Sequence, residues 1–211
     1  MNDKFFKLSD EKQKAIINAG CKGFFKYGYR KVSMSEIAME AGISKALLFH
    51  YFKNKKEFYL YLFAYALELT RQFAKEEISI SETDLFEIFM QSARIKSRLL
   101  RQHAHLSRFM MSAYYEVDEE VAKDIKAKTN VVTANSIESI LVRMDRRKLK
   151  DEINVEELVR IILWCGEGYM KEKYYDEQLD IDKIQAGYAK MLYFFRQSCY
   201  KDQYRKSQFD E

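Results

Sequence analysis

The chain has 211 residues, of which 47% are hydrophobic and 32% are charged, so it is long enough to bury a substantial core in one large or two small domains. With no proline and only seven glycines, it lacks the turn residues of an all-β protein, and its composition favours helices joined by short connections. The net charge of +4 is uneven, because residues 1–56 hold twelve Lys and Arg against five Asp and Glu, which indicates either contact with a polyanion or a solvated basic surface.

The first predicted helix covers residues 9–27. Ile16, Gly20 and Phe24 repeat at the spacing of one helix face, and Ser9 is a suitable N-cap ahead of two acidic residues. Gly28 is expected to end this helix, because glycine readily leaves helical geometry.

A second helix is predicted to begin at Ser33. Ser33 and Glu36 have the spacing of a capping box, and Val32 and Ile37 have the spacing of a hydrophobic staple. Gly42 is expected to end the helix in the left-handed conformation that glycine tolerates.

A third helix is predicted from Ser44 to Tyr51. Ser44 is the N-cap, and Ile43 and Leu48 again have the spacing of a staple. Two short helices joined by a glycine-containing turn of this length are typical of the helix-turn-helix.

A fourth, long helix is predicted to start after Asn54, with Glu57 at its N3 position. Further helices are expected near residues 83–102, 104–114, 118–146, 154–174 and 181–204. The sequence therefore predicts an all-α protein of about nine helices. Residues 1–54 would form a three-helix domain that contains the helix-turn-helix, and residues 55–211 a helical bundle.

In a helix-turn-helix the segment after Ser44 would enter the major groove. With Leu48 and Ile43 turned inward, the side chains left to meet base edges are Lys45, Ala46, Leu47, Phe49, His50 and Tyr51. The candidates for phosphate anchoring, near helix N-termini, are Ser33, Ser44 and Lys55. Taken singly, each has a simpler explanation: serines cap helices in any protein, an exposed lysine is usually a solvated charge, and the aromatic residues suit a core.

The run from Ile16 to Phe58 resembles the N-terminal domain of the TetR family. The resemblance is carried by Phe24-Phe25-x-x-Gly28-Tyr29, by Ser33-Met34-x-x-Ile37-Ala38-x-x-Ala41-Gly42-Ile43-Ser44-Lys45 and by Leu48-Phe49-His50-Tyr51-Phe52-Lys53-Asn54-Lys55-Lys56-Glu57-Phe58. It is unbroken over this run, whereas the rest of the chain matches the family only in length and helical character.

The resemblance implies a homodimer that reads DNA with the 44–51 helix, and a C-terminal domain that binds a ligand and dimerises. It assigns DNA contacts to the positions of Ser33, Ser44, Lys45, Ala46, Leu47, Phe49, His50 and Lys55. The chain departs from the family at three of them, with Ala46, Leu47 and Phe49 where the family commonly has Gly, Thr and Tyr. Two hydroxyl groups are therefore missing from the DNA face, which favours apolar contacts with thymine methyl groups.

The C-terminal part is rich in aromatic and methionine side chains, which suit either an apolar ligand cavity or ordinary core packing. The expected ligand-binding residues are Phe86, Phe89, Met90, Arg94, Phe109, Met110, Tyr114, Trp164 and Tyr169. The expected dimer interface, from apolar stripes on the last two helices, comprises Leu158, Ile162, Cys165, Tyr169, Tyr188, Met191 and Phe195. Gly166 and Gly168 would allow close helix approach, although an intramolecular core explains the stripes equally well.

The sequence shows no catalytic constellation, and no cofactor or metal is expected. His103 and His105 lie two positions apart on a predicted helix, so they point away from each other, and the three cysteines are widely scattered. The absence of a signal peptide and of a ~20-residue apolar run predicts a cytoplasmic protein without a membrane span.

These features together predict a dimeric transcriptional regulator, expected to be a repressor. It would bind a near-palindromic double-stranded DNA operator and be released by a small, largely apolar or aromatic effector. Two alternatives stay open at this point. A helical enzyme would need a polar catalytic group, and a helical scaffold for protein partners would leave the basic N-terminal segment unexplained.

Overall fold

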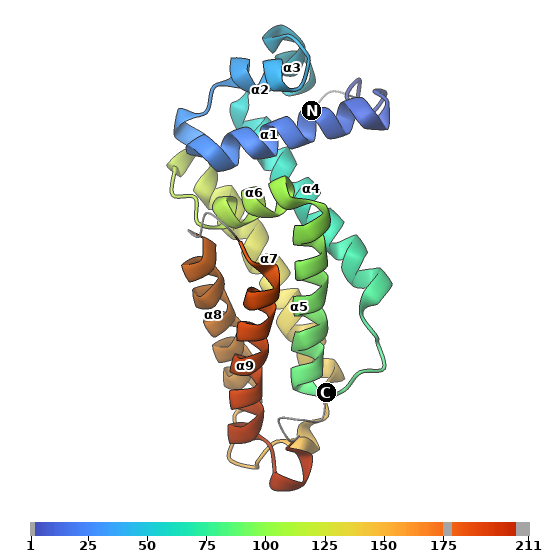
Figure 1. Cartoon of the computed structure of the whole chain (residues 1–211), viewed down its shortest axis with the longest axis vertical. Helices are drawn as coiled ribbons and strands as arrows, with labels where there is room; N and C mark the ends of the chain where they lie inside the picture. Colours follow the sequence, from blue (N-terminus) through green and yellow to red (C-terminus); the bar gives the residue numbers. More distant parts are fainter. Residues whose placement is uncertain (1–2, 175–178, 206–211) are drawn as a thin grey trace. The chain divides into compact units, whose positions relative to one another are not determined.

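The structure is a computed structural model that describes residues 3–174 and 179–205, and within these ranges the chain is all-α. Its α-helices are α1 (Asp10–Lys31), α2 (Met34–Glu40), α3 (Lys45–Tyr51), α4 (Lys55–Glu77), α5 (Leu85–Gln102), α6 (Ala104–Tyr114), α7 (Glu119–Arg143), α8 (Val155–Tyr174) and α9 (Ile181–Cys199) (Figure 1). Two short 3-10 helices, η1 (Arg146–Lys148) and η2 (Asp202–Tyr204), complete the described part. None of its helices has the length and apolar character needed to cross a membrane.

The chain packs into two compact units. The first consists of Met1–Arg71 and Gln102–Asn130, and the second of Gln72–Arg101 and Val131–Glu211. The unit boundaries therefore fall inside α4, at the last residue of α5 and inside α7, and α6 belongs to the same unit as α1–α3. The division expected after residue 54 was based on the roles of the two parts and not on how they pack, and it stays a prediction.

Helical geometry in α1 breaks at Gly28, as the sequence predicts. Gly28 has φ 71° and ψ 168°, a conformation that is open to glycine and strained for other residues. One further turn follows, and the Val32 N–H donates to the Gly28 carbonyl at 3.3 Å. The last residue assigned to α1 is consequently Lys31.

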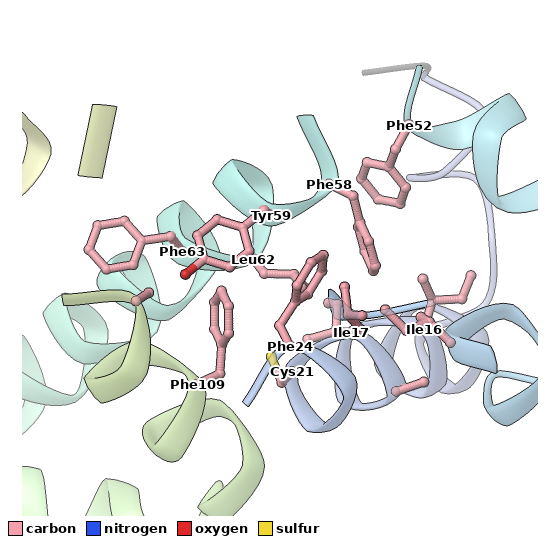
Figure 2. Close-up of a cluster of buried hydrophobic side chains, with 14 of the residues drawn as sticks. Ile16, Ile17, Cys21, Phe24, Phe52, Phe58, Tyr59, Leu62, Phe63 and Phe109 are labelled. Atoms are coloured by element: carbon pink, nitrogen blue, oxygen red, sulfur yellow. The ribbon is translucent and has the colours of Figure 1, made fainter. Parts of the chain in front are cut away.

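Rings and aliphatic side chains from α1, α4 and α6 fill the core of the first unit (Figure 2). Phe109 of α6 is fully buried, with its ring centroid 5.0 Å from Tyr59 and 6.1 Å from Phe24. Gly20 allows α4 to pack closely on α1, because a Cβ there would lie 2.5 Å from Cζ of Phe58. In this unit α1 lies between the α2–α3 pair and α6 (Figure 1).

The second unit has its own core, formed by α5, α8, α9 and residues 131–144. Its fully or almost fully buried members include Leu85, Phe86, Phe89, Ile140, Met144, Val159, Ile162, Leu192 and Tyr200. At one end of this unit a charged group is buried as well: Asp84 is 7% exposed and Arg196 is 5% exposed. A buried carboxylate is tolerated only when it is paired, and here both Arg196 and Lys148 donate to it.

The predicted helices are confirmed, and most of their bounds agree to within a few residues. The clearest difference is α9, which ends at Cys199 rather than near residue 204. The backbone becomes extended there because Tyr200 forms an antiparallel bridge with Leu149. Two hydrogen bonds make the bridge, each 2.9 Å long: the Lys150 N–H donates to the Cys199 carbonyl, and the Lys201 N–H donates to the Lys148 carbonyl. This partner lies 51 positions away, so the periodicity of the helix gave no signal of it.

Candidate DNA-binding surface

Hydrogen bonds fix both ends of α2, including the point where it enters the turn to α3. Gly42 has φ 70°, and its N–H donates to Met39 while the Ile43 N–H donates to Ala38, the pair of bonds that defines a Schellman motif. At the start of α2 the Ser33 Oγ accepts from the Glu36 N–H at 3.3 Å. The turn therefore fixes the direction in which α3 leaves α2.

The outer face of α3 carries the side chains predicted to read DNA. The Ser44 Oγ accepts from the Leu47 N–H at 3.1 Å and caps the helix, while Leu48 is fully buried beneath it. Of the predicted contact residues, Ser44, Lys45, Ala46 and His50 are exposed, and Ser33, Leu47 and Phe49 are half-buried. The Lys45 ammonium lies 6.0 Å from the centroid of Phe49, so the charge and the ring share one part of this face.

Tyr51 lies elsewhere, because its side chain turns into the domain. It is 6% exposed, and its ring meets that of Phe5 edge-on at 5.9 Å. Phe52 is fully buried in the same group of rings. Tyr51 thus supports α3 from behind, and the structure leaves it little surface for a base contact. No local pattern could reveal this, since the ring that covers it comes from the N-terminal segment.

Lys55 is fixed at the start of α4, the helix that Asn54 caps by accepting from the Glu57 N–H at 2.8 Å. The Lys55 ammonium donates to the Arg30 carbonyl at 3.1 Å and lies 4.9 Å from the centroid of Tyr29. These contacts hold the charge against the end of α1, close to the segment that leads into α2. A phosphate near the start of α2 would find this cation in a defined position.

The predicted ligand-binding residues do not form one cluster in either unit. Phe109, Met110 and Tyr114 belong to α6 of the first unit, whereas Phe86, Phe89, Met90, Arg94, Trp164 and Tyr169 belong to the second. Phe86, Phe89 and Phe109 are buried in the two cores, Met90 and Met110 are half-buried, Tyr114 is 38% exposed, and Arg94 and Trp164 are exposed. The three buried rings therefore belong to the cores of the two units, and their part in ligand binding stays a prediction.

Two polar side chains of the second unit that the sequence did not single out have buried atoms without a hydrogen-bond partner in the described part of the chain. They are Oε1 of Gln91 and both Nε and Nη2 of Arg143. Leaving such atoms unsatisfied costs about 1–3 kcal/mol each, and more for a charged group. A ligand that offered an acceptor to Arg143 would remove this cost.

The apolar residues of α8 divide between two faces. Leu158 and Ile162, predicted for the dimer interface, are 5% and 0% exposed in the core of the chain itself, so they offer no surface to a partner. The predicted Cys165 is exposed, together with Ile161 and Trp164 at 40% and 64%. On α9 the predicted Tyr188, Met191 and Phe195 are half-buried against the core, whereas Phe194, which the prediction omitted, is 66% exposed.

Two glycine–tyrosine pairs join α8 to α9. Tyr188 packs over Gly166, where a Cβ would lie 3.1 Å from its ring, and Tyr169 packs over Gly187 in the reverse sense. The Tyr169 hydroxyl also donates to the Lys183 carbonyl at 3.4 Å. Gly166 thus allows the expected close approach, but within one chain. A Cβ on Gly168 would meet no atom, so that glycine lies on the open side of α8.

Comparison with known proteins agrees with this geometry. Residues 16–62 match the family model for bacterial regulatory proteins of the tetR family. A relative, the HTH-type transcriptional regulator YhgD of Bacillus subtilis (strain 168), is 24% identical over 131 residues, which cover 57% of this chain and 69% of the relative.

Solved structures share the fold over most of the chain. A TetR family transcriptional regulator from Chloroflexus aurantiacus J-10-FL superposes with a TM-score of 0.68 at 17% identity, covering 95% of this chain and 98% of that one. FadR, a fatty acid degradation regulator from Bacillus halodurans, has a TM-score of 0.68 at 15% identity, covering 85% of this chain and 96% of that one.

Proposed function

We propose that this chain, which belongs to the TetR family of transcriptional regulators, is a ligand-responsive repressor that binds a near-palindromic DNA operator as a homodimer. Proteins of this family are DNA-binding transcription factors and not enzymes, which sets the helical-enzyme alternative aside. The observation that carries the proposal is the outer face of α3, where exposed Lys45, Ala46 and His50 stand on a helix anchored by the buried Leu48.

Each exposed position on α3 has a definite role in this proposal. Lys45 donates to a phosphate or to the acceptor edge of a guanine, and His50 supplies a second hydrogen-bonding head. Ala46, with the half-buried Leu47 and Phe49, meets thymine methyl groups. Ser33, Ser44 and Lys55 anchor phosphates at the N-terminal ends of α2, α3 and α4.

The dimer would form through the open side of α8 and the exposed Phe194 of α9. Ile161, Trp164, Cys165 and Gly168 recur at the spacing of one helix face, and Trp164 is the largest apolar side chain exposed there. An exposed apolar stripe of this kind marks an interaction surface. Two α3 helices related by a two-fold axis would then enter successive major grooves about 34–36 Å apart.

The effector is a small molecule with a largely apolar or aromatic body and, at one end, an acidic group that pairs with Arg143. Two observations support this chemistry. The buried Nε and Nη2 of Arg143 have no partner in the described residues, and a protein of the same fold, FadR, regulates fatty acid degradation. A ligand that favours a distance between the two α3 helices unsuited to DNA would shift the dimer population away from the DNA-bound form.

To test operator binding, fragments of the source genome that bind the full-length protein are selected. Their affinity for the protein is then measured by fluorescence anisotropy. A fragment with two half-sites should bind far more tightly than random DNA, and Lys45→Ala should weaken that binding, while Lys128→Ala on α7 should not. Equal affinity for every fragment, with no effect of Lys45→Ala, would reject the proposal.

The effector chemistry is tested with dodecanoate and dodecanol, which share an apolar chain and differ in the acidic head. Dodecanoate should raise the melting temperature and release the operator, and Arg143→Met should abolish both effects. If the acid and the alcohol acted alike on both proteins, the assigned role of Arg143 would be wrong.

A further inference from the structure

The segment before α1 is firmly seated on the first unit. Phe5 is fully buried, and its ring packs against three rings, one each from α3, its C-cap and α4. The ring centroids lie 5.0 Å from Phe52, 5.4 Å from Tyr61 and 5.9 Å from Tyr51. Burial of one phenylalanine stabilises a fold by about 1.5–3 kcal/mol, and each ring pair adds roughly 0.5–1.5 kcal/mol. This is enough to hold a short segment in place.

The backbone of the same segment is fixed too. The Leu8 N–H donates to the Phe5 carbonyl at 3.1 Å and closes a turn. From α1 the Gln13 side-chain amide donates to the carbonyls of Leu8 at 2.9 Å and Phe6 at 3.4 Å. Residues 3–8, which we call the N-terminal turn, therefore have a defined conformation before any partner binds.

The N-terminal turn lies at the C-terminal end of α3. Tyr51 is the last residue of that helix and Phe52 is its C-cap, and both contact Phe5. Ser44 and Lys45 mark the opposite end of α3, which spans roughly 10 Å at 1.5 Å per residue. The turn therefore lies beside the end of α3 that is opposite to Ser44 and Lys45.

The charges of the turn suit a polyanion. Lys4 and Lys7 flank the buried Phe5, and both side chains are exposed. Lys53, also exposed, directly follows Phe52, so a third cation belongs to the same region. Duplex DNA carries one negative charge for about every 1.7 Å of its axis, so a helix that enters the major groove has phosphates close to both of its ends.

We propose that the N-terminal turn is a second DNA-contacting element, in which Lys4 and Lys7 bind the phosphate backbone beside the C-terminal end of α3. This inference rests on the proposed function, because it places the duplex against α3. The turn adds affinity without sequence preference, since phosphate contacts carry no base information. Its fixed conformation means that little ordering entropy is lost when DNA binds.

The test compares the double variant Lys4→Gln/Lys7→Gln with Lys126→Gln/Lys128→Gln, which removes the same charge from exposed positions on α7 of the same unit. Affinity for the selected operator and for random DNA is measured at salt concentrations from about 50 to about 200 mM, because the release of counterions changes the affinity strongly over this range. The turn variant should lower the slope of log K against log salt by about two units and weaken both DNAs by a similar factor. The α7 variant should retain the wild-type slope.

A turn variant with the wild-type slope and affinity would overturn this inference while leaving the proposed function intact. A loss confined to the operator would also overturn it, because that would make the lysines base-reading residues. A wild-type protein that bound no fragment at all would overturn both proposals.

Discussion

The guanidinium of Arg196 donates to both carboxylate oxygens of Asp84, at 2.7 and 3.3 Å, although the two residues lie 112 positions apart in the chain. The same Asp84 caps α5, accepting from the N–H groups of Phe86 and Glu87 at 3.1 and 3.2 Å. Arg196 also lies against the rings of Phe86 and Tyr200. One ion pair thus joins the start of α5 to the end of α9.

Arg196→Ala should lower the free energy of unfolding by about 3–5 kcal/mol, because it leaves the Asp84 carboxylate buried with less than its full set of partners. Urea denaturation followed by circular dichroism measures the loss. Arg147→Ala is the matched control, since Arg147 pairs with Asp145 on the surface and is 86% exposed. The control should keep the wild-type midpoint, and an equal loss in both variants would contradict the role of the buried pair.

Asp84 should also make the unfolding free energy depend on pH. Burial alone would raise the pKa of this carboxyl, but the charge of Arg196 and the hydrogen bond from Lys148 outweigh it and hold the pKa below its ordinary value. A depressed folded-state pKa contributes stability above the unfolded pKa of about 3.9 and loses it as the pH falls through the folded value. Urea midpoints between about pH 6 and pH 3 should therefore fall less steeply for Asp84→Asn than for wild type. Parallel curves would contradict this.

Gly42→Ala should destabilise the first unit through the backbone alone. A Cβ at Gly42 would meet no atom, yet its φ of 70° costs an ordinary L-residue roughly 1–2 kcal/mol. Asparagine tolerates this conformation better, so Gly42→Asn should unfold between wild type and Gly42→Ala in a thermal melt. Operator affinity should follow the same order, since the turn directs α3. Equal melting of the two variants would argue against a backbone cause.

Trp164→Glu should convert the proposed dimer to a monomer, because it places a charge in the middle of the exposed apolar stripe of α8. Sedimentation equilibrium measures the change in mass, and the melting temperature of the monomer shows whether the chain still folds. Val142→Glu on α7 is the control, as Val142 is 80% exposed and lies outside the stripe. Dimerisation that survived Trp164→Glu would place the interface elsewhere.

The parts of the structure that the sequence predicted well are those settled by nearby residues. Ser33, Ser44 and Asn54 each cap a helix through an N–H three positions ahead, and Gly42 ends α2 by its own conformational freedom. Such interactions are complete within one turn of chain, so spacing alone identifies them. The helix-turn-helix and the exposure of Lys45, Ala46 and His50 followed from the same local rules.

What the sequence could not supply depends on partners distant in the chain. Leu158 and Ile161 are both apolar residues of α8, but only the packing of the second unit determines that the first is buried and the second exposed. Tyr51 was predicted on the outward side of α3, and the ring of Phe5 covers it. A helix whose apolar stripe is wider than about 100° can pack in more than one orientation about its axis, and the residues packed against it determine which orientation is adopted.

The place of α6 in the first unit has a consequence for protein engineering. Phe109 packs against both Phe24 and Tyr59, and the Glu116 carboxylate accepts from the Tyr29 N–H at 3.3 Å, so the first 54 residues depend on a segment encoded far downstream. A fragment cut after residue 54 would lack Tyr59 and Phe109, so Phe24 would be exposed to water, and the fragment should aggregate rather than fold as an independent domain. A chimaera with a related regulator must therefore exchange residues 102–130 together with residues 1–54, or redesign the contact between these two segments.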